Sequence, residues 1–409
     1  MSTRGLLALL LIAAPAGAAH GQLPQLSGYY LNVAAASGTG AFTDPTAFDF
    51  QRARLMTAPS YGAFGFDVAY EHLFTLRDGA TGTTLTGGTA VAASAGDFLP
   101  LQWTIEESEF VVWRHRFDRL LVRYLGERVE VTLGRQTVSW ATTLYLTPAD
   151  PFQPFDPSDP FREYRIGVDA LRARAFPGPL SELDAVVRVT EVNTSVALPG
   201  GEPVTDTTVT ALGRARVALG HWELSGWAGL VHDEASVSAA ATVTAGGAAV
   251  RGEGVLRRSA GETVLRFTVG VDRSFTVARR TLYVAAEYQY DEWGYSDTDA
   301  LLAVAASAPA LRGELQALGR HEIVALANFE VHPLVSTDLL GIVNPVDPSG
   351  LIVPSITYSA REDATVRAGL YVGIGAERGE LVLPTGIAAP GSEYGAVPLT
   401  GYASVTVFF

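Results

Sequence analysis

The stretch ETVLRFTVGVD, from Glu262 to Asp272, alternates from Leu265 onward between apolar residues and polar or small ones. Its apolar residues stand two apart and are separated by polar, charged or small ones: Leu265, Phe267, Val269 and Val271 against Arg266, Thr268, Gly270 and Asp272. Side chains two apart share one face of a β-strand, so the stretch predicts a strand with one apolar and one polar face.

The same alternation recurs along most of the chain. Soluble β-sandwiches also alternate, but these segments run to about nine to eleven residues, the length that crosses a bilayer at a tilt. We expect strands near 25–34, 47–57, 61–74, 110–125, 128–139, 167–176, 182–190, 207–219, 222–231, 235–244, 248–257, 262–273, 279–290, 319–331, 335–344, 351–359, 364–375 and 400–409.

The connections between these segments differ in length in a regular way. Every second connection is short, and the remaining ones include all the long ones: 75–109, 140–166, 191–206, 291–318 and 376–399. Short periplasmic turns and long extracellular loops are typical of outer-membrane barrels. The pattern predicts an all-β fold, a transmembrane antiparallel β-barrel of about 18 strands, with 16 as the alternative count.

The two ends of the chain agree with export to an outer membrane. Residues 1–19 have a basic residue, an apolar run and a small-residue end, which is the form of a signal peptide, so the barrel is expected to occupy 20–409. The last residues, GYASVTVFF, resemble the final strand of bacterial outer-membrane proteins, whose terminal aromatic residue is read by the barrel-assembly machinery. Phe409 is therefore the expected assembly signal.

The composition excludes several classes of function. A net charge of −14 disfavours binding to nucleic acid, and the absence of cysteine excludes disulfides, thiolate nucleophiles and Cys-ligated zinc. The seven histidines are scattered, and no linear motif of a metalloprotease, serine hydrolase or phosphate loop is present. We expect no cofactor, no metal and no enzymatic activity, although a barrel hydrolase with its catalytic residues on adjacent strands would leave no linear motif.

Four short motifs carry a resemblance to a known family. GRQTVSW at 134–140 precedes a Pro/Asp-rich loop and GVDALRAR at 167–174, and later come Asn344 with the sequence DPSG at 347–350 and SEY at 392–394. Together they resemble a porin-like group of bacterial outer-membrane barrels, and the Gly-Arg-Gln element is similar to that of alginate-export barrels. Those barrels have glycine after the tryptophan, where this chain has Ala141.

If the outward faces are apolar, the polar faces line the pore. The pore-lining candidates are Arg52, Arg54, Arg172, Arg174, Arg188, Arg214, Arg216, Arg266, Arg367, Glu253, Asp272 and Glu287. One interpretation is a set of neutralising ion pairs that hydrate the wall. The other is that local arginine clusters attract anions, because a low-dielectric wall focuses their field.

The stretch TPADPFQPFDPSDPF, from Thr147 to Phe161, carries a proline at every third position. Polyproline II has three residues per turn, so this spacing favours a rod with one acidic and one mostly apolar edge. One hypothesis is that the rod folds into the lumen as a constriction with its aspartates facing arginines such as Arg172 and Arg174, and the other is that it is a stiff extracellular loop. The constriction candidates are Asp150, Phe152, Phe155, Asp156, Asp159 and Phe161.

The sequence thus favours a porin-like channel of the cell outer membrane for passive diffusion of small hydrophilic solutes, with anions as a candidate subclass. Its expected partners are outer-membrane lipid and lipopolysaccharide, the barrel-assembly machinery and small solutes. Two alternatives stay open: a dedicated channel for export or uptake of a polysaccharide or other acidic polymer, and a non-transporting barrel that is an enzyme or adhesin.

Overall fold

The computed structural model describes residues 25–78, 98–152, 157–159, 161, 165–193, 205–382 and 388–409. The expected signal peptide at 1–19 lies outside these residues. The wall of the molecule is formed by β1 (Ser27–Ser37), β2 (Thr46–Thr57), β4 (Phe64–Arg77), β6 (Val111–Leu125), β7 (Val129–Gln136), β8 (Val168–Gly178), β9 (Ser181–Asn193), β10 (Thr205–Leu219), β11 (Trp222–Val231), β12 (Glu234–Ala245), β13 (Ala248–Ser259), β14 (Glu262–Val277), β15 (Arg280–Asp291), β16 (His321–His332), β17 (Val335–Asn344), β18 (Ser349–Arg361), β19 (Ala364–Ile374) and β22 (Thr400–Phe408).

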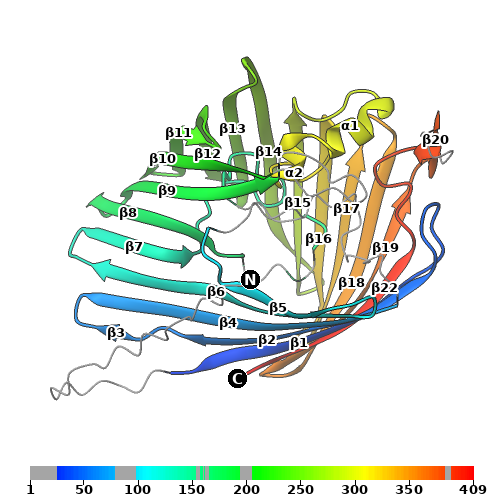
Figure 1. Ribbon diagram of the computed structural model, residues 1–409, viewed down its shortest axis with the longest axis horizontal. Helices are drawn as coiled ribbons and strands as arrows, with labels where there is room; N and C mark the ends of the chain where they lie inside the picture. The colour runs from blue at the N-terminus through cyan, green and yellow to red at the C-terminus, as the bar shows by residue number, and fades with distance from the viewer. Residues whose placement is uncertain are drawn as a thin grey trace, which may run out of the picture.

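Within the described residues these eighteen strands form a closed antiparallel barrel. Each strand pairs with the next one along the wall, and β1 pairs with β22 through partners such as Tyr29 and Phe408, which closes the ring (Figure 1). The predicted fold class is confirmed with the count of 18 rather than 16. Closure leaves no free sheet edge, as a membrane-spanning sheet requires.

The remaining elements are short. They are β3 (Ser60–Tyr61), β5 (Gln102–Glu107), the hairpin of β20 (Arg378–Val382) and β21 (Ala388–Pro390), and the helices η1 (Thr298–Ala300), α1 (Leu301–Ala305) and α2 (Ala308–Leu311). The helices lie at the rim beyond β15 and β16 (Figure 1). No helix of the described chain is long and apolar enough to span a membrane.

The alternation of the sequence matches the two faces of the wall. In β14, Leu265 and Val269 are 38% and 49% exposed, whereas Arg266 and Thr268 between them are 4% and 0% exposed. Leu265 and Val269 therefore face outward, away from the lumen, and Arg266 and Thr268 face into the barrel. Most of the exposed large apolar side chains belong to the outer face in the same way.

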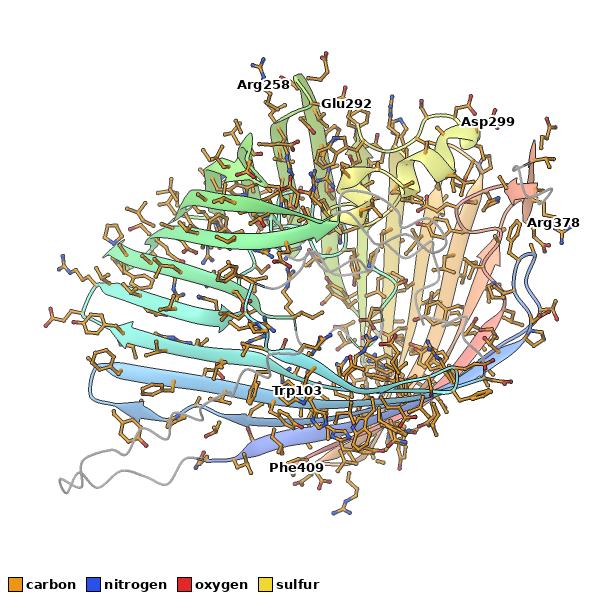
Figure 2. The ribbon with its side chains drawn as sticks, in the orientation of Figure 1. Trp103, Arg258, Glu292, Asp299, Arg378 and Phe409 are labelled. Atoms are coloured by element: carbon orange, nitrogen blue, oxygen red, sulfur yellow. The ribbon has the colours of Figure 1, made fainter. Side chains whose placement is uncertain are left out.

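Turn chemistry explains the short connections at the periplasmic end. Gly220, Gly246 and Gly247 adopt positive φ in the two-residue turns that join β10 to β11 and β12 to β13. Because all strands are antiparallel, the longest connections leave the opposite end of the barrel, as the alternation of loop lengths predicted. Figure 2 shows Arg258 and Phe409 near these two opposite ends.

Two of the motifs that carry the family resemblance, 134–140 and 167–174, form a clamp at the base of the connection between β7 and β8. Arg135 donates two hydrogen bonds of 2.8 Å to Asp169, and it also donates to the carbonyls of Leu99 and Phe117. Arg135 and Asp169 are both buried. The clamp therefore joins β7 and β8 to the segment that precedes β5.

A steric constraint explains why glycine occupies position 134, at the start of the clamp. Gly134 has a φ of +118°, and a Cβ atom built there would lie 2.3 Å from the carbonyl oxygen of Leu120 on β6. Only glycine fits this close approach without moving a strand.

The last residue joins the barrel wall. Phe409 exchanges two backbone hydrogen bonds with Gly28, at 2.8 and 3.0 Å, next to the pairing of β1 with β22. Its side chain is 61% exposed on the outside. The role of Phe409 as an assembly signal stays a prediction.

Substituting Gly134→Ala should destabilise the folded barrel by about 1 to 3 kcal/mol, because both the backbone conformation and the contact with Leu120 become strained. Urea titration of the protein folded in lipid vesicles, followed by tryptophan fluorescence, measures this. Gly213→Ala is the matched control, because a Cβ there meets nothing within 4 Å. Equal stability of the two variants would contradict the steric argument.

Candidate functional site: a loop held inside the barrel

The connection between β7 and β8, residues 137–167, is called the inner loop below. Its described part contacts the inward faces of β9, β11, β13, β15, β19 and β22, which lie on different sides of the barrel. The inner loop therefore lies within the lumen. Phe155 and Asp156 fall outside the described residues.

Two carboxylates of the wall bind the backbone of the inner loop. Glu253 on β13 accepts hydrogen bonds from the amides of Thr142 at 2.6 Å, Thr143 at 3.1 Å and Ala149 at 3.1 Å. Both oxygens of Glu253 are used, and its side chain is 4% exposed. A charged acceptor satisfies three amides that would otherwise be buried without a partner.

Glu287 on β15 acts in the same way one step further along the loop. It accepts from the amides of Leu144 at 2.5 Å, Tyr145 at 2.9 Å and Leu146 at 2.9 Å. With Glu253, it binds six backbone amides between Thr142 and Ala149. Charge-assisted hydrogen bonds are each worth about 1.5 to 3 kcal/mol, so the two carboxylates fix the path of this segment.

Aromatic contacts hold the next part of the inner loop against β9 and β11. Trp140 donates from Nε1 to Asp184 at 2.8 Å, and Phe152 packs on its ring at a centroid distance of 5.0 Å. Trp227 on β11 donates from Nε1 to the carbonyl of Ala149 at 2.9 Å. These rings belong to a buried apolar cluster with Val186 and Leu212 of the wall.

The far part of the inner loop reaches the opposite side of the wall. Tyr371 on β19 donates to the carbonyl of Ser158 at 3.0 Å, and Phe161 packs edge-on against Tyr402 on β22. Leu144, Tyr145, Leu146 and Phe161 join a second apolar cluster with inward side chains of β1 and β15 to β19. The described loop thus bridges two walls of the lumen.

Asp150 has partners other than the Arg172 and Arg174 of the constriction hypothesis, and Asp156 lies outside the described residues. Asp150 accepts from Ser139 at 2.9 Å and forms an ion pair with Arg165, both within the inner loop. Asp159 caps the amide of Phe161 at 2.8 Å. Arg172 and Arg174 bind carboxylates of the wall instead.

The proline spacing does not produce a continuous polyproline II rod either. The amide of Asp150 donates to the carbonyl of Thr147 at 3.0 Å, which closes a turn. Polyproline II has no internal hydrogen bonds, so the expected rod is wrong at its first prolines. The hydrogen bonds of Ala149 with Glu253 and Trp227 outweigh the local preference of the proline-rich sequence for polyproline II.

Six of the twelve predicted pore-lining residues form ion pairs with charged side chains on other strands of the wall. The pairs are Arg54 with Glu71 at 2.6 Å and Asp118 at 2.7 Å, Arg172 with Asp184 at 2.6 Å, Arg174 with Glu130 at 2.6 Å, Arg216 with Glu223 at 2.6 Å, Arg266 with Asp291 at 2.7 Å, and Arg251 with Asp272. This arrangement favours the interpretation of neutralising ion pairs.

The other predicted arginines make contacts of a different kind. Arg52 lies 3.4 Å from the Tyr29 hydroxyl and over the Phe50 ring, and Arg214 lies over the Trp140 ring at 5.8 Å. Arg188 donates to the carbonyl of Phe152 at 3.3 Å, and Arg367 donates to Thr357 at 2.9 Å.

Sequence reasoning missed the apolar inner face that receives the inner loop. On β18, Leu351 and Val353 point inward and are buried, while Ile352 points outward and is exposed. A strand that is apolar on both faces is covered on both, by lipid outside and by protein inside. The run of apolar residues on both faces of β18 is visible in the sequence. By contrast, no sequence pattern predicts that the side chain of Gln316 accepts from the amide of Thr147 at 2.5 Å.

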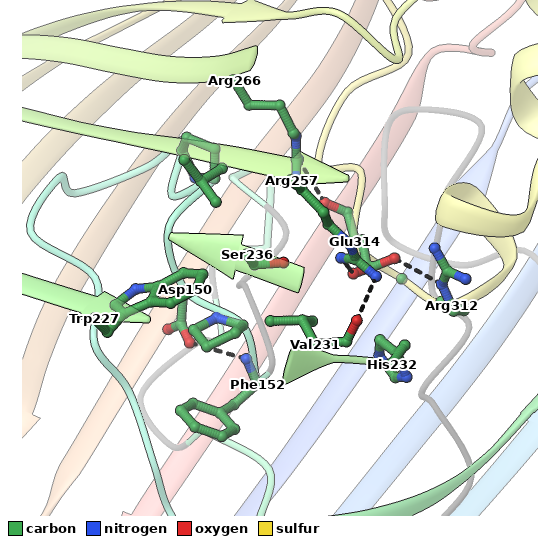
Figure 3. Close-up of a pocket in the computed structure, with 14 residues that line it drawn as sticks. Asp150, Phe152, Trp227, Val231, His232, Ser236, Arg257, Arg266, Arg312 and Glu314 are labelled. Carbon is green, nitrogen blue, oxygen red and sulfur yellow. Dashed lines mark hydrogen bonds and ion pairs between the residues drawn. The ribbon is translucent and has the colours of Figure 1, made fainter. Parts of the chain in front are cut away.

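A second extracellular segment docks beside the inner loop. Glu314, which follows α2, forms ion pairs with Arg257 on β13 and with Arg312, next to Phe152, Trp227 and His232 (Figure 3). The cavity between these groups is about 30 Å³, roughly the room of one water molecule.

The electrostatics of this contact follow from burial and the arginines. Burial alone would raise the pKa of Glu314, but the Arg257 and Arg312 guanidiniums outweigh it and lower the pKa to about 2. Burial lowers the pKa of His232 to about 4, so this imidazole adds no charge at neutral pH.

Comparisons with known proteins show which solved structures have a similar fold. No protein-family model matches the chain, and no curated protein matches it significantly. Among solved structures, OccAB3 of Acinetobacter baumannii is 8% identical, with 94% of this chain and 99% of that chain covered and a TM-score of 0.57. The outer membrane protein OpdK of Pseudomonas aeruginosa is 9% identical, with 94% and 99% covered and a TM-score of 0.55.

A third similar structure carries a ligand. OccK2 (OpdF) of Pseudomonas aeruginosa, solved in complex with glucuronate, is 11% identical, with 94% and 97% covered and a TM-score of 0.54. At such identities the likeness is one of fold. The closed barrel has the fold of outer-membrane porins, which is the fold that the sequence predicted. More particularly, its fold is similar to that of the Occ and Opd porins.

Substituting Glu287→Gln should loosen the inner loop, because the amide offers one acceptor oxygen in place of two charged ones. A loss of about 1.5 to 3 kcal/mol would accelerate hydrogen exchange of the segment around Leu144 to Leu146 by about tenfold to a hundredfold. Exchange followed by mass spectrometry measures this. Glu223→Gln, which removes a charge of the Arg216 ion pair elsewhere on the wall, should leave that segment unchanged; equal acceleration in both variants would contradict the anchoring role.

The pH dependence of the Glu314 contact has a defined sign. Its folded pKa lies below its unfolded value, so its stabilisation is present above about pH 4.5 and disappears as the pH falls through about 2. The unfolding free energies of the native protein and Glu314→Gln should therefore differ at neutral pH and converge near pH 2. A difference that does not change with pH would refute this assignment, and Glu362→Gln in an exposed turn is the control.

Proposed function

We propose that this protein is a passive channel of the outer membrane for small hydrophilic solutes, narrowed by its inner loop. The observation that carries the proposal is the set of six backbone hydrogen bonds by which Glu253 and Glu287 hold the inner loop across the lumen. In this role Asp150, Phe152, Asp159 and Phe161 border the narrowest region. Passive diffusion requires no enzymatic step.

Small anions, carboxylates among them, are the proposed preferred solutes. OccK2, which has the same fold, is solved with glucuronate, and OpdK is solved with vanillate; both ligands carry a carboxylate. In this chain, Arg214 lies over the ring of Trp140 and Arg52 over the ring of Phe50, and each guanidinium extends from the inward face of its strand. A guanidinium on an aromatic face keeps donors available to an incoming anion.

The polymer-export alternative is less well supported. It needs a continuous arginine path, whereas Arg54, Arg172, Arg174, Arg216 and Arg266 are each paired with a carboxylate. The proposed partners in the membrane are lipid, lipopolysaccharide and, through Phe409, the barrel-assembly machinery.

Reversal potentials across a planar bilayer under a KCl gradient test the solute preference. The native channel should prefer chloride, and Arg214→Ala should shift the reversal potential toward cation preference because one positive lumenal charge is lost. Arg258→Ala, at the rim outside the lumen (Figure 2), should have no such effect. Cation preference of the native channel would reject the anion assignment, and a folded protein without conductance would reject the channel itself.

Deleting residues 148–160 tests the narrowing. Because conductance rises with the open cross-section, the deleted channel should conduct about twofold more or better. The native heat-modifiable migration on gels serves as the check that the barrel still folds. A folded variant with unchanged conductance would show that the inner loop does not limit the pore.

A further inference from the structure

Three extracellular connections meet at a buried group of acidic side chains. Glu322 stands at the outer end of β16, Asp347 lies between β17 and β18, and Glu393 lies in the connection between β19 and β22. Their exposed fractions are 1%, 9% and 4%. Asp347 and Glu393 belong to the sequence motifs DPSG and SEY.

Asp347 binds two neighbouring segments. It accepts from the hydroxyl of Tyr295 at 2.6 Å and from the amide of Glu393 at 2.6 Å through Oδ2, and from the hydroxyl of Ser349 at 2.6 Å through Oδ1. Tyr295 belongs to the connection 292–320, which also carries the helices. Asp347 thus joins that connection to the one that carries Glu393.

Glu393 makes the reciprocal bonds. It accepts from the amides of Leu318 at 2.8 Å and Gly319 at 3.1 Å, and from the side chain of Asn344 at 2.9 Å. Asp347 and Glu393 are therefore acceptors whose donors are all accounted for by backbone amides, hydroxyls and an amide side chain.

Glu322 differs from the other two. Neither of its buried oxygens has a hydrogen-bond partner within the described residues. Its carboxyl lies within the electrostatic reach of the carboxyl of Glu393, and of two such buried carboxyls one carries a proton. Glu393 already accepts from three donors, so Glu322 is the group that carries the proton.

Within the described residues, no basic side chain neutralises the charge of the three carboxyl groups. The groups facing Glu322 are Glu393, Asp347 and Tyr295 from the connections, Asn344 from β17 and Gln289, its partner across from β15. Asp291 on β15 is engaged by Arg266. Among the described residues no basic side chain pairs with the three carboxyls, and no group of His, Asp and Glu has the geometry of a metal site.

Burial disfavours the ionised form of these groups. It raises the pKa of the Glu393 carboxyl, against the hydrogen bonds from Leu318 and Asn344, and it raises the pKa of the Tyr295 hydroxyl. Two adjacent carboxyls in such a site cannot both be ionised.

We infer that Glu322 and Glu393 form a buried proton-binding site whose single proton holds the extracellular connections 292–320 and 375–399 together. Loss of this proton places a second negative charge beside Glu393. The repulsion weakens the hydrogen bonds of Leu318 and Gly319 and releases the two connections from each other. The site therefore closes the outer surface at neutral and acidic pH and loosens it at alkaline pH.

Hydrogen exchange of the full-length protein in lipid vesicles tests this without relying on conduction. The protection of the peptide containing Leu318 and Gly319, corrected for the intrinsic exchange rate at each pH, should fall about tenfold or more between about pH 6 and about pH 9.5. In Glu322→Gln, which keeps a neutral donor for Glu393, the protection should not depend on pH. Glu330→Gln on the same strand should behave like the native protein.

Three outcomes would overturn the proposal. They are a native protection that does not change with pH, a Glu322→Gln variant as sensitive to pH as the native protein, and loosening by EDTA at neutral pH, which would mean that a cation rather than a proton occupies the site. If Glu322→Gln does not fold, Glu393→Gln replaces it and should be loose at every pH. Because the readout is exchange, failure of the channel proposal would leave this result unaffected.

Discussion

The structure depends on one constraint: the inner loop has no regular secondary structure, so its buried backbone amides need hydrogen-bond acceptors from the barrel wall. Between Thr142 and Ala149 the inner loop has no ladder partner, and six of its amides are bound by Glu253 and Glu287. An unpaired buried amide is costly, and a carboxylate with two oxygens can satisfy several at once. The position of these two acidic side chains on β13 and β15 therefore decides where the inner loop lies in the lumen.

The wall supports this arrangement at both ends of the inner loop. Arg135 and Asp169 join β7 to β8 where the loop begins and ends, so that its two stems are held side by side. The apolar inner face of β18 and its neighbours receives Leu146 and Phe161. Six of the predicted lumenal charges are paired across strands, which lowers the net field that the wall creates in the lumen.

The fold follows closely from the sequence, because alternation at a period of two needs no tertiary information. The predicted strand at 262–273 corresponds to β14, and the order of short and long connections follows from the antiparallel closure. The inward direction of Glu253 and Glu287 is predicted by the same alternation. Their role as anchors is not, since it depends on the path of a loop more than a hundred residues away in the chain. The local signal of the prolines even points to a rod, which tertiary contacts at Ala149 override.

Single-channel conductance of the double variant Glu253→Ala and Glu287→Ala tests the central claim most directly. With both anchors removed, the inner loop loses its six backbone acceptors, and the channel should show a larger mean conductance with frequent fluctuations between levels. The double variant Glu223→Ala and Asp272→Ala, which removes two lumenal acids that do not contact the inner loop, should conduct steadily at the native level. A quiet channel of native conductance after loss of both anchors would contradict the account.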